Sequence, residues 1–110
     1  GALDYLQNKY GLQVNVIPNG FQCEIINTPG HTKDSKSFYF PNINAIFVGD
    51  FIFKGSIGRT DLGGNNEEMK KSIKMFLDSD LEDMILYPGH GEPTTIRDEK
   101  DNLEYFLNTL

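Results

Sequence analysis

The sequence predicts an α/β fold, and three observations support this prediction. Short strand-like segments fill the first half of the 110-residue chain. Two segments with helical spacing of apolar residues lie in the second half, and one more strand-like segment lies between them. Strands followed by the order helix, strand, helix are typical of an α/β layer arrangement.

The strands are predicted as two hairpins and one single strand. Val14–Ile17 and Phe21–Asn27 flank a Pro-Asn-Gly sequence, which is typical of a turn. Ser37–Phe40 and Ala45–Gly49 flank a Pro-Asn-Ile-Asn sequence in the same way. Met84–Tyr87 is a brief apolar run and is predicted to form the strand between the two helices.

The helices are predicted from apolar stripes and from capping patterns. Asn65 can cap the first helix with Glu68 three residues on, and Thr95 with Asp98 resembles the same capping box before the second. The glycine-rich stretch from Phe53 to Gly64 lacks periodicity and is predicted to be a long loop. The stripes are Met69, Ile73, Phe76 and Leu77 in the first helix, and Leu103, Phe106, Leu107 and Leu110 in the second.

Composition limits the classes of partner. The chain carries 10 basic and 16 acidic residues, a formal net charge of −6. Because the basic residues are scattered, binding to nucleic acid or to an anionic membrane is not expected. No apolar run reaches the ~18 residues of a membrane span. The single cysteine, Cys23, cannot form an internal disulfide, so we expect a reducing, cytoplasmic setting. Cys23 itself is expected to be a small, buried residue of a strand.

Both histidines of the chain follow the dipeptide Pro-Gly. His31 and His90 each come shortly after a strand-like run, and Asp50 follows the run that ends at Gly49. Functional groups of α/β proteins gather at the carboxyl ends of strands. Two imidazoles and a carboxylate on converging loops suit a divalent metal such as zinc. On spacing alone, the alternative of two unconnected surface histidines stays open.

Six motifs occur in order along the chain. They are Thr28-Pro29-Gly30-His31-Thr32, Phe47-Val48-Gly49-Asp50, Gly55-Ser56-Ile57-Gly58-Arg59-Thr60-Asp61-Leu62, Tyr87-Pro88-Gly89-His90-Gly91, Thr94-Thr95-Ile96 and Glu99-Lys100. Together they resemble the metallo-β-lactamase superfamily, in particular its hydroxyacylglutathione hydrolase (glyoxalase II)-like branch. The resemblance extends from residue 14 to residue 110.

The resemblance implies a fold and a metal site. The expected fold is half of an αβ/βα sandwich, a mixed sheet with helices packed on one face. Residues 1–110 would be the C-terminal half of a domain, because the upstream H-x-H-x-D-H segment of the family is absent from this sequence. By resemblance, His31 completes one metal site, His90 completes a second, and Asp50 bridges them as the candidate catalytic residue. One or two zinc ions are expected, with iron or manganese as alternatives, bound weakly or not at all by this chain alone.

The resemblance also implies an activity. The complete domain is expected to be a metal-dependent hydrolase of an acyl-thioester such as a hydroxyacyl-glutathione, and this chain alone is expected to be inactive. One alternative is an iron-dependent persulfide dioxygenase on the same fold. Another is a non-catalytic half-domain that acts as an interaction module. A half sandwich exposes an apolar sheet face, so the expected partner is the missing N-terminal half or a second copy of the chain.

Several motif residues admit a structural interpretation. Arg59 and Asp61 form either an ion pair that organises the floor of the site or a loop-internal salt bridge. Thr94, Thr95 and Glu99 are interpreted as capping residues of the second helix. Tyr87 and the phenylalanines are interpreted as core residues and not as a substrate wall.

Overall fold

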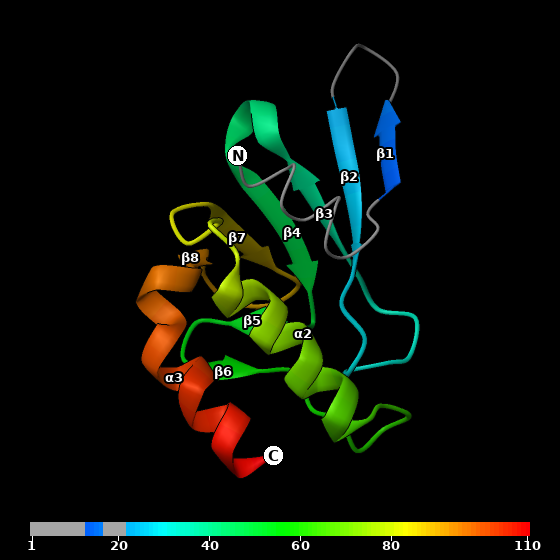
Figure 1. The fold of residues 1–110 in the computed structure, drawn as a ribbon, viewed down its shortest axis with the longest axis vertical. Helices are drawn as coiled ribbons and strands as arrows, with labels where there is room; N and C mark the ends of the chain where they lie inside the picture. Colours follow the sequence, from blue (N-terminus) through cyan, green and yellow to red (C-terminus); the bar gives the residue numbers. More distant parts are fainter. Residues whose placement is uncertain (1–12, 17–21) are drawn as a thin grey trace.

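The main sheet has six strands and carries two helices on one face (Figure 1). The computed structural model describes residues 13–16 and 22–110. Its elements are β1 (Gln13–Val16), β2 (Gln22–Asn27), β3 (Lys36–Phe40), the 3-10 helix η1 (Pro41–Ile43), β4 (Ala45–Gly49), β5 (Ile52–Phe53), β6 (Ser56–Ile57), α2 (Asn66–Asp78), β7 (Ile85–Pro88), β8 (Thr94–Thr95) and α3 (Ile96–Thr109).

The strand order of the main sheet is β1-β2-β3-β4-β7-β8. Strands β1 to β4 pair antiparallel in chain order, so both predicted hairpins are confirmed, although the first turn lies outside the described residues. Strand β7 joins β4 in parallel, and β8 pairs antiparallel with β7. The sheet is therefore mixed, as expected. Strands β2, β4 and β7 run in the same direction, so their carboxyl ends meet at one edge of the sheet.

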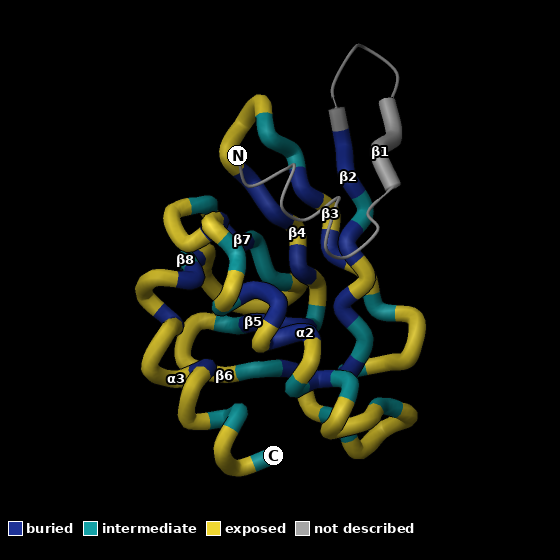
Figure 2. The backbone as a smooth tube through the Cα atoms, in the orientation of Figure 1, coloured by how far each residue is buried: buried dark blue, intermediate teal, exposed yellow. Residues whose placement is uncertain are grey.

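Both helices pack on the same face of the sheet and enclose the core (Figure 2). Side chains alternate between the two faces of a strand, so every second residue of β2, β3, β4 and β7 points at the helices. The apolar side chains that form this core from the sheet are Ile26, Tyr39, Ile46, Val48 and Leu86. The helices contribute Met69, Ile73, Met75, Phe76, Ile96 and Leu103, which include four of the eight predicted stripe residues. The other four are partly buried and pack against this core: Leu77, Phe106, Leu107 and Leu110.

The opposite face of the sheet carries a row of apolar side chains. Phe38 is 39% exposed, Phe47 is 42% exposed and Ile85 is 38% exposed. Phe47 lies between Phe38 and Tyr87 in the strand register and stacks on the Tyr87 ring, with 5.1 Å between centroids. The core interpretation of the phenylalanines is therefore correct for Phe51 and Phe76 but wrong for Phe38 and Phe47.

The helix starts agree with the prediction. The side-chain oxygen of Asn65 accepts a hydrogen bond from the backbone N–H of Glu68 at 3.0 Å. The hydroxyl of Thr95 accepts one from the N–H of Asp98 at 3.1 Å. Each bond satisfies one of the free N–H groups of a first turn. Within the described ranges, no helix is both long and apolar enough to cross a membrane.

The loop predicted between Phe53 and Gly64 is partly wrong. The two-residue strands β5 and β6 form a tight hairpin there, with Ile52 paired to Ile57. A third short strand, β8, was also missed. Two residues are too few to produce an alternating pattern, so hydrophobic periodicity could not predict these strands.

Candidate metal centre

The three candidate metal ligands lie at the same edge of the sheet. His31 lies four residues beyond the end of β2, Asp50 directly follows β4, and His90 lies two residues beyond β7. The N–H of Gly89 donates to the carbonyl oxygen of Gly49 at 2.9 Å and holds the last two strand ends together. The parallel direction of β2, β4 and β7 thus brings together side chains that are up to 59 residues apart in the sequence.

Each histidine faces a different oxygen of the Asp50 carboxylate. Nε2 of His31 lies 3.4 Å from Oδ2 of Asp50, and Nε2 of His90 lies 3.5 Å from Oδ1. Both distances exceed the usual length of a hydrogen bond. Ligand bonds of about 2.0–2.1 Å at tetrahedral zinc place neighbouring ligand atoms about 3.3–3.4 Å apart. The spacing of each pair is compatible with two ligands of one ion, and the carboxylate offers one oxygen to each of two candidate positions.

The ligand set is incomplete for either position. Among the residues that the structure describes, no three His, Cys, Asp or Glu side chains form a group that could hold one ion. Each of the two positions has one nitrogen and one oxygen, whereas catalytic zinc takes three protein ligands. The site is also open, since the His90 side chain is 79% exposed. The geometry therefore fits two incomplete candidate metal positions, with Asp50 common to both, better than it fits one complete metal site.

A backbone carbonyl fixes the orientation of the His31 ring. Nδ1 of His31 lies 2.8 Å from the carbonyl oxygen of Arg59. A carbonyl oxygen can only accept, so in this bond the proton is on Nδ1. In the neutral ring, Nε2 then presents its lone pair toward Asp50, which is the form that binds metal. His90 has a different neighbour, the ring of Phe53, with 6.1 Å between ring centroids.

Two glycines allow the backbone to close around Asp50. A Cβ atom on Gly58 would lie 1.7 Å from the carbonyl oxygen of Asp50 and 3.4 Å from Nδ1 of His31. A Cβ atom on Gly89 would lie 2.8 Å from Oδ1 of Asp50. Both glycines belong to the motifs recognised in the sequence, but only the structure shows that they are needed for close approach.

The Arg59–Asp61 pair is confirmed as a salt bridge within the loop. Nε and a terminal nitrogen of Arg59 donate to the two Asp61 oxygens at 2.7 and 2.6 Å. These hydrogen bonds lower the pKa of Asp61 to about 2. Both side chains are exposed, and within the described part of the chain the guanidinium has no other ion-pair partner. Arg59 contacts the site through its main-chain carbonyl and not through its charge.

Sequence reasoning missed the role of Glu99. Thr95 caps α3 as predicted, but the capping interpretation of Thr94 and Glu99 is wrong. The buried Glu99 carboxylate accepts hydrogen bonds from the Thr94 hydroxyl, from the Gly55 N–H at 2.7 Å and from the Asn102 amide at 3.3 Å. Burial raises the pKa of Glu99, but these bonds outweigh it and the net shift is downward. The available signal was an acid four residues before Leu103, on the apolar stripe of the helix.

Comparison with known proteins identifies relatives over most of the chain. The family model of the metallo-beta-lactamase superfamily matches residues 18–90. The probable metallo-hydrolase YqgX of Bacillus subtilis is 39% identical over 97 residues, which cover 87% of this chain and 44% of YqgX. The hydroxyacylglutathione hydrolase GloC of Haemophilus influenzae is 40% identical over 92 residues, covering 83% of this chain and 43% of GloC.

Solved structures show the same fold. The B3 metallo-beta-lactamase BLEG-1 matches with a TM-score of 0.73 and 36% identity, over 84% of this chain and 44% of that one. TTHA1623 in a di-iron-bound form matches with a TM-score of 0.67 and 34% identity, over 71% of this chain and 39% of that one. The chain spans less than half the length of each of these four proteins.

Proposed function

The chain belongs to the metallo-beta-lactamase superfamily, and from that premise we propose that it is part of a metal-dependent hydrolase of acyl-thioesters such as hydroxyacyl-glutathione. The observation that carries the proposal is the position of Asp50, whose two oxygens face Nε2 of His31 and Nε2 of His90 at 3.4 and 3.5 Å. This is the arrangement expected of a carboxylate that bridges two ions.

The residues of this chain have distinct roles in that proposal. His31 and His90 would each supply one ring nitrogen to hold a divalent ion, and the Asp50 carboxylate beside both rings would supply oxygen ligands. A bound divalent cation supplies Lewis-acid chemistry, because it lowers the pKa of water toward about 7 and polarises a carbonyl. Zinc suits imidazole and carboxylate ligands, and iron or manganese can use the same ligands. Asp50 faces both histidines, so its replacement should affect the binding of metal at either one.

The substrate class is supported by similarity and not by a pocket in this structure. GloC is named as a hydroxyacylglutathione hydrolase and shares 40% identity over 92 residues. The matched region includes only 43% of GloC, so the residues that recognise the substrate in the complete protein need not lie in this part. The assignment of a thioester substrate therefore has to be tested on a longer protein that includes the upstream segment.

The first experiment compares the activity of the chain alone with that of the complete protein. We expect the purified chain with added zinc to show no turnover of a hydroxyacyl-glutathione, because each position has only two ligands. We expect the longer protein that carries an upstream H-x-H-x-D-H segment to turn over this thioester, and Asp50→Asn to abolish the activity while the protein stays folded. Chelator-sensitive turnover by the chain alone would contradict the first expectation. A folded, zinc-loaded longer protein without thioesterase activity would contradict the second.

A second candidate function is an iron-dependent persulfide dioxygenase. It is favoured by the Gly58-Arg59-Thr60-Asp61 sequence, which resembles that class. Iron content and oxygen consumption of the longer protein distinguish the two, since a hydrolase consumes no oxygen.

A third candidate, a non-catalytic interaction module, is favoured by the exposed apolar sheet face. It predicts that the parent gene encodes no H-x-H-x-D-H segment upstream.

A further inference from the structure

A buried carboxylate on α3 is connected to the candidate metal centre through one loop. We propose that Glu99 is a positioning residue of this centre: it holds the β5–β6 hairpin, and the hairpin places the Arg59 carbonyl that orients His31. The inference rests on the proposed metal function. It adds a residue that contacts neither the ligands nor a substrate.

The position of Glu99 is unusual for a residue with only a packing role. Its side chain is only 4% exposed, on a helix face that otherwise buries Ile96 and Leu103. Burying a carboxylate is unfavourable unless it is fully hydrogen-bonded. Two of its three partners, Thr94 and Asn102, are close in sequence. The third is the backbone N–H of Gly55, 44 residues away, and this bond is the one that reaches the loop.

The bond to Gly55 fixes the tip of the hairpin. Phe53 pairs with Ser56, so Lys54 and Gly55 form the turn between β5 and β6. Gly55 has a φ of +84°, which glycine adopts without strain. The Lys54 ammonium also pairs with Glu92 at 2.8 Å, which ties the tip to the segment that follows His90. Both of these side chains are exposed, so the buried bond to Glu99 is the stronger constraint.

The base of the hairpin carries the constraint to His31. The N–H of Gly58 donates to the carbonyl oxygen of Phe51 at 3.0 Å, which closes the hairpin directly beside Asp50. The next carbonyl, that of Arg59, accepts the Nδ1–H of His31 at 2.8 Å. The tip and the base of the hairpin are therefore both fixed, and the His31 acceptor lies one residue beyond the base.

The test measures the tautomer of His31 without metal. Long-range ¹H–¹⁵N spectra, recorded at a pH where the rings are neutral, report which ring nitrogen carries the proton. We expect the Nδ1–H form in the parent chain. In Glu99→Leu, which fills the same space without a carboxylate, we expect a shift toward the Nε2–H form that free histidine prefers. Glu99→Gln keeps an oxygen acceptor for the Gly55 N–H and should restore the parent tautomer.

Two controls separate positioning from loss of stability. Leu103→Ala removes core contacts one turn along the same helix face and should leave the His31 tautomer unchanged. Thr94→Val removes one donor to Glu99 with little change in shape, and should shift the tautomer less than Glu99→Leu if that variant folds. If Glu99→Leu does not fold, the proposal requires a measurable shift in Thr94→Val. An unchanged tautomer in the folded Glu99 variant, or an equal shift in Leu103→Ala, overturns the proposal.

Zinc titration of the same variants gives a second readout. Loss of a partner that supports a ligand typically weakens metal binding ~10–100-fold. We expect a loss of at least ~10-fold in Glu99→Leu and none in Leu103→Ala. If the parent chain binds no zinc but the tautomer shifts as expected, the positioning role stands, and the metal function is then decided by zinc binding and activity of the longer protein. If zinc binds equally well to all variants and the tautomer is unchanged, the positioning role fails alone.

Discussion

At the scale of single residues, the candidate site depends on which atom of Asp50 faces which histidine. Because each histidine faces a different oxygen of the Asp50 carboxylate, the chain offers two pairs of candidate ligands and not a group of three. We predict weak zinc binding by the isolated chain, further weakened at least ~10-fold by His31→Ala or by His90→Ala. Calorimetric titration checks this. Tight binding by the parent, or weak binding that neither substitution changes, would show that these histidines are not the ligands.

The glycine beside Asp50 gives a second residue-level prediction. Gly58→Ala places a Cβ atom 1.7 Å from the Asp50 carbonyl oxygen, so the backbone must move. We expect a loss of roughly 3 kcal/mol in the free energy of unfolding, measured with urea. Gly63→Ala is the matched control, because its Cβ meets nothing within 4 Å and only its φ of +87° is unfavourable. The control should cost about 1–2 kcal/mol. Equal losses in the two variants would contradict the close packing around Asp50.

The loop salt bridge predicts a pH dependence in acid. Hydrogen bonds from Arg59 lower the pKa of Asp61 from 3.8 to about 2, so ionised Asp61 stabilises the folded state. A lowered pKa gives a stabilisation that is complete above 3.8 and is lost as the pH falls through about 2. We therefore expect the difference in melting temperature between the parent and Asp61→Asn to shrink as the pH is lowered across this range. The difference should be small, since both side chains are exposed. A constant difference from pH 5 to pH 2 would contradict the pairing.

At the scale of elements, locally encoded features were predictable and those set by tertiary contacts were not. Both helices were predicted because their caps and stripes lie within a few residues of each other. The strand ends that carry His31, Asp50 and His90 were predicted because each of these residues closely follows a strand-like run in the sequence. Strands β5, β6 and β8 were not, because a strand of two residues is too short to show an alternating pattern in the sequence. The contacts of Glu99 and of the Arg59 carbonyl were missed because they span 44 and 28 residues.

The cap of α2 gives a prediction at the element scale. Asn65 accepts from the Glu68 N–H through its side chain, while its own N–H donates to the carbonyl oxygen of Gly30 at 3.0 Å. Asn65→Ala removes only the first of these bonds and should lower the free energy of unfolding by about 1 kcal/mol. Asn65→Asp keeps an acceptor at the helix start and should retain most of the stability. Equal losses in both variants would show that the side chain is not acting as a cap.

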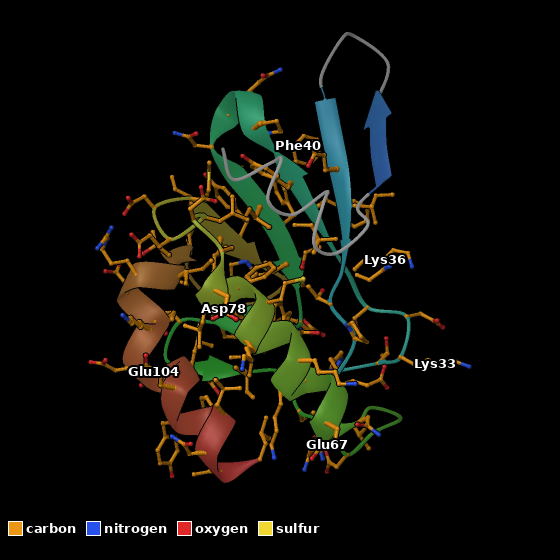
Figure 3. All side chains as sticks on the ribbon, in the orientation of Figure 1. Lys33, Lys36, Phe40, Glu67, Asp78 and Glu104 are labelled. Carbon is orange, nitrogen blue, oxygen red and sulfur yellow. The ribbon has the colours of Figure 1, made fainter. Side chains whose placement is uncertain are left out.

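At the scale of the whole molecule, the two faces of the sheet differ in how far other elements cover them. The helices bury one face, and charged side chains project outward from them: Glu67 from α2 and Glu104 from α3 (Figure 3). Lys33 projects outward from the loop after β2. The other face exposes Phe38 and Phe47. Soluble proteins seldom leave a contiguous apolar surface of this kind unpaired. Because the chain spans less than half the length of its relatives, the remainder of such a protein is one candidate to cover this face, and a second copy is the other.

The final prediction follows from that face and from the net charge. In the absence of any other protein we expect the isolated chain to self-associate through the sheet, and Phe47→Asp to weaken this association by placing a charge in the centre of the apolar row. Leu62→Asp is the matched control, because Leu62 is 65% exposed in the loop before α2. It should leave the association unchanged. The charge of −6 on each chain opposes pairing, so raising the salt concentration should strengthen it by screening. Light scattering over a range of protein and salt concentrations measures all three effects. A monodisperse monomer at high concentration and high salt would contradict the prediction, as would equal weakening by the two substitutions.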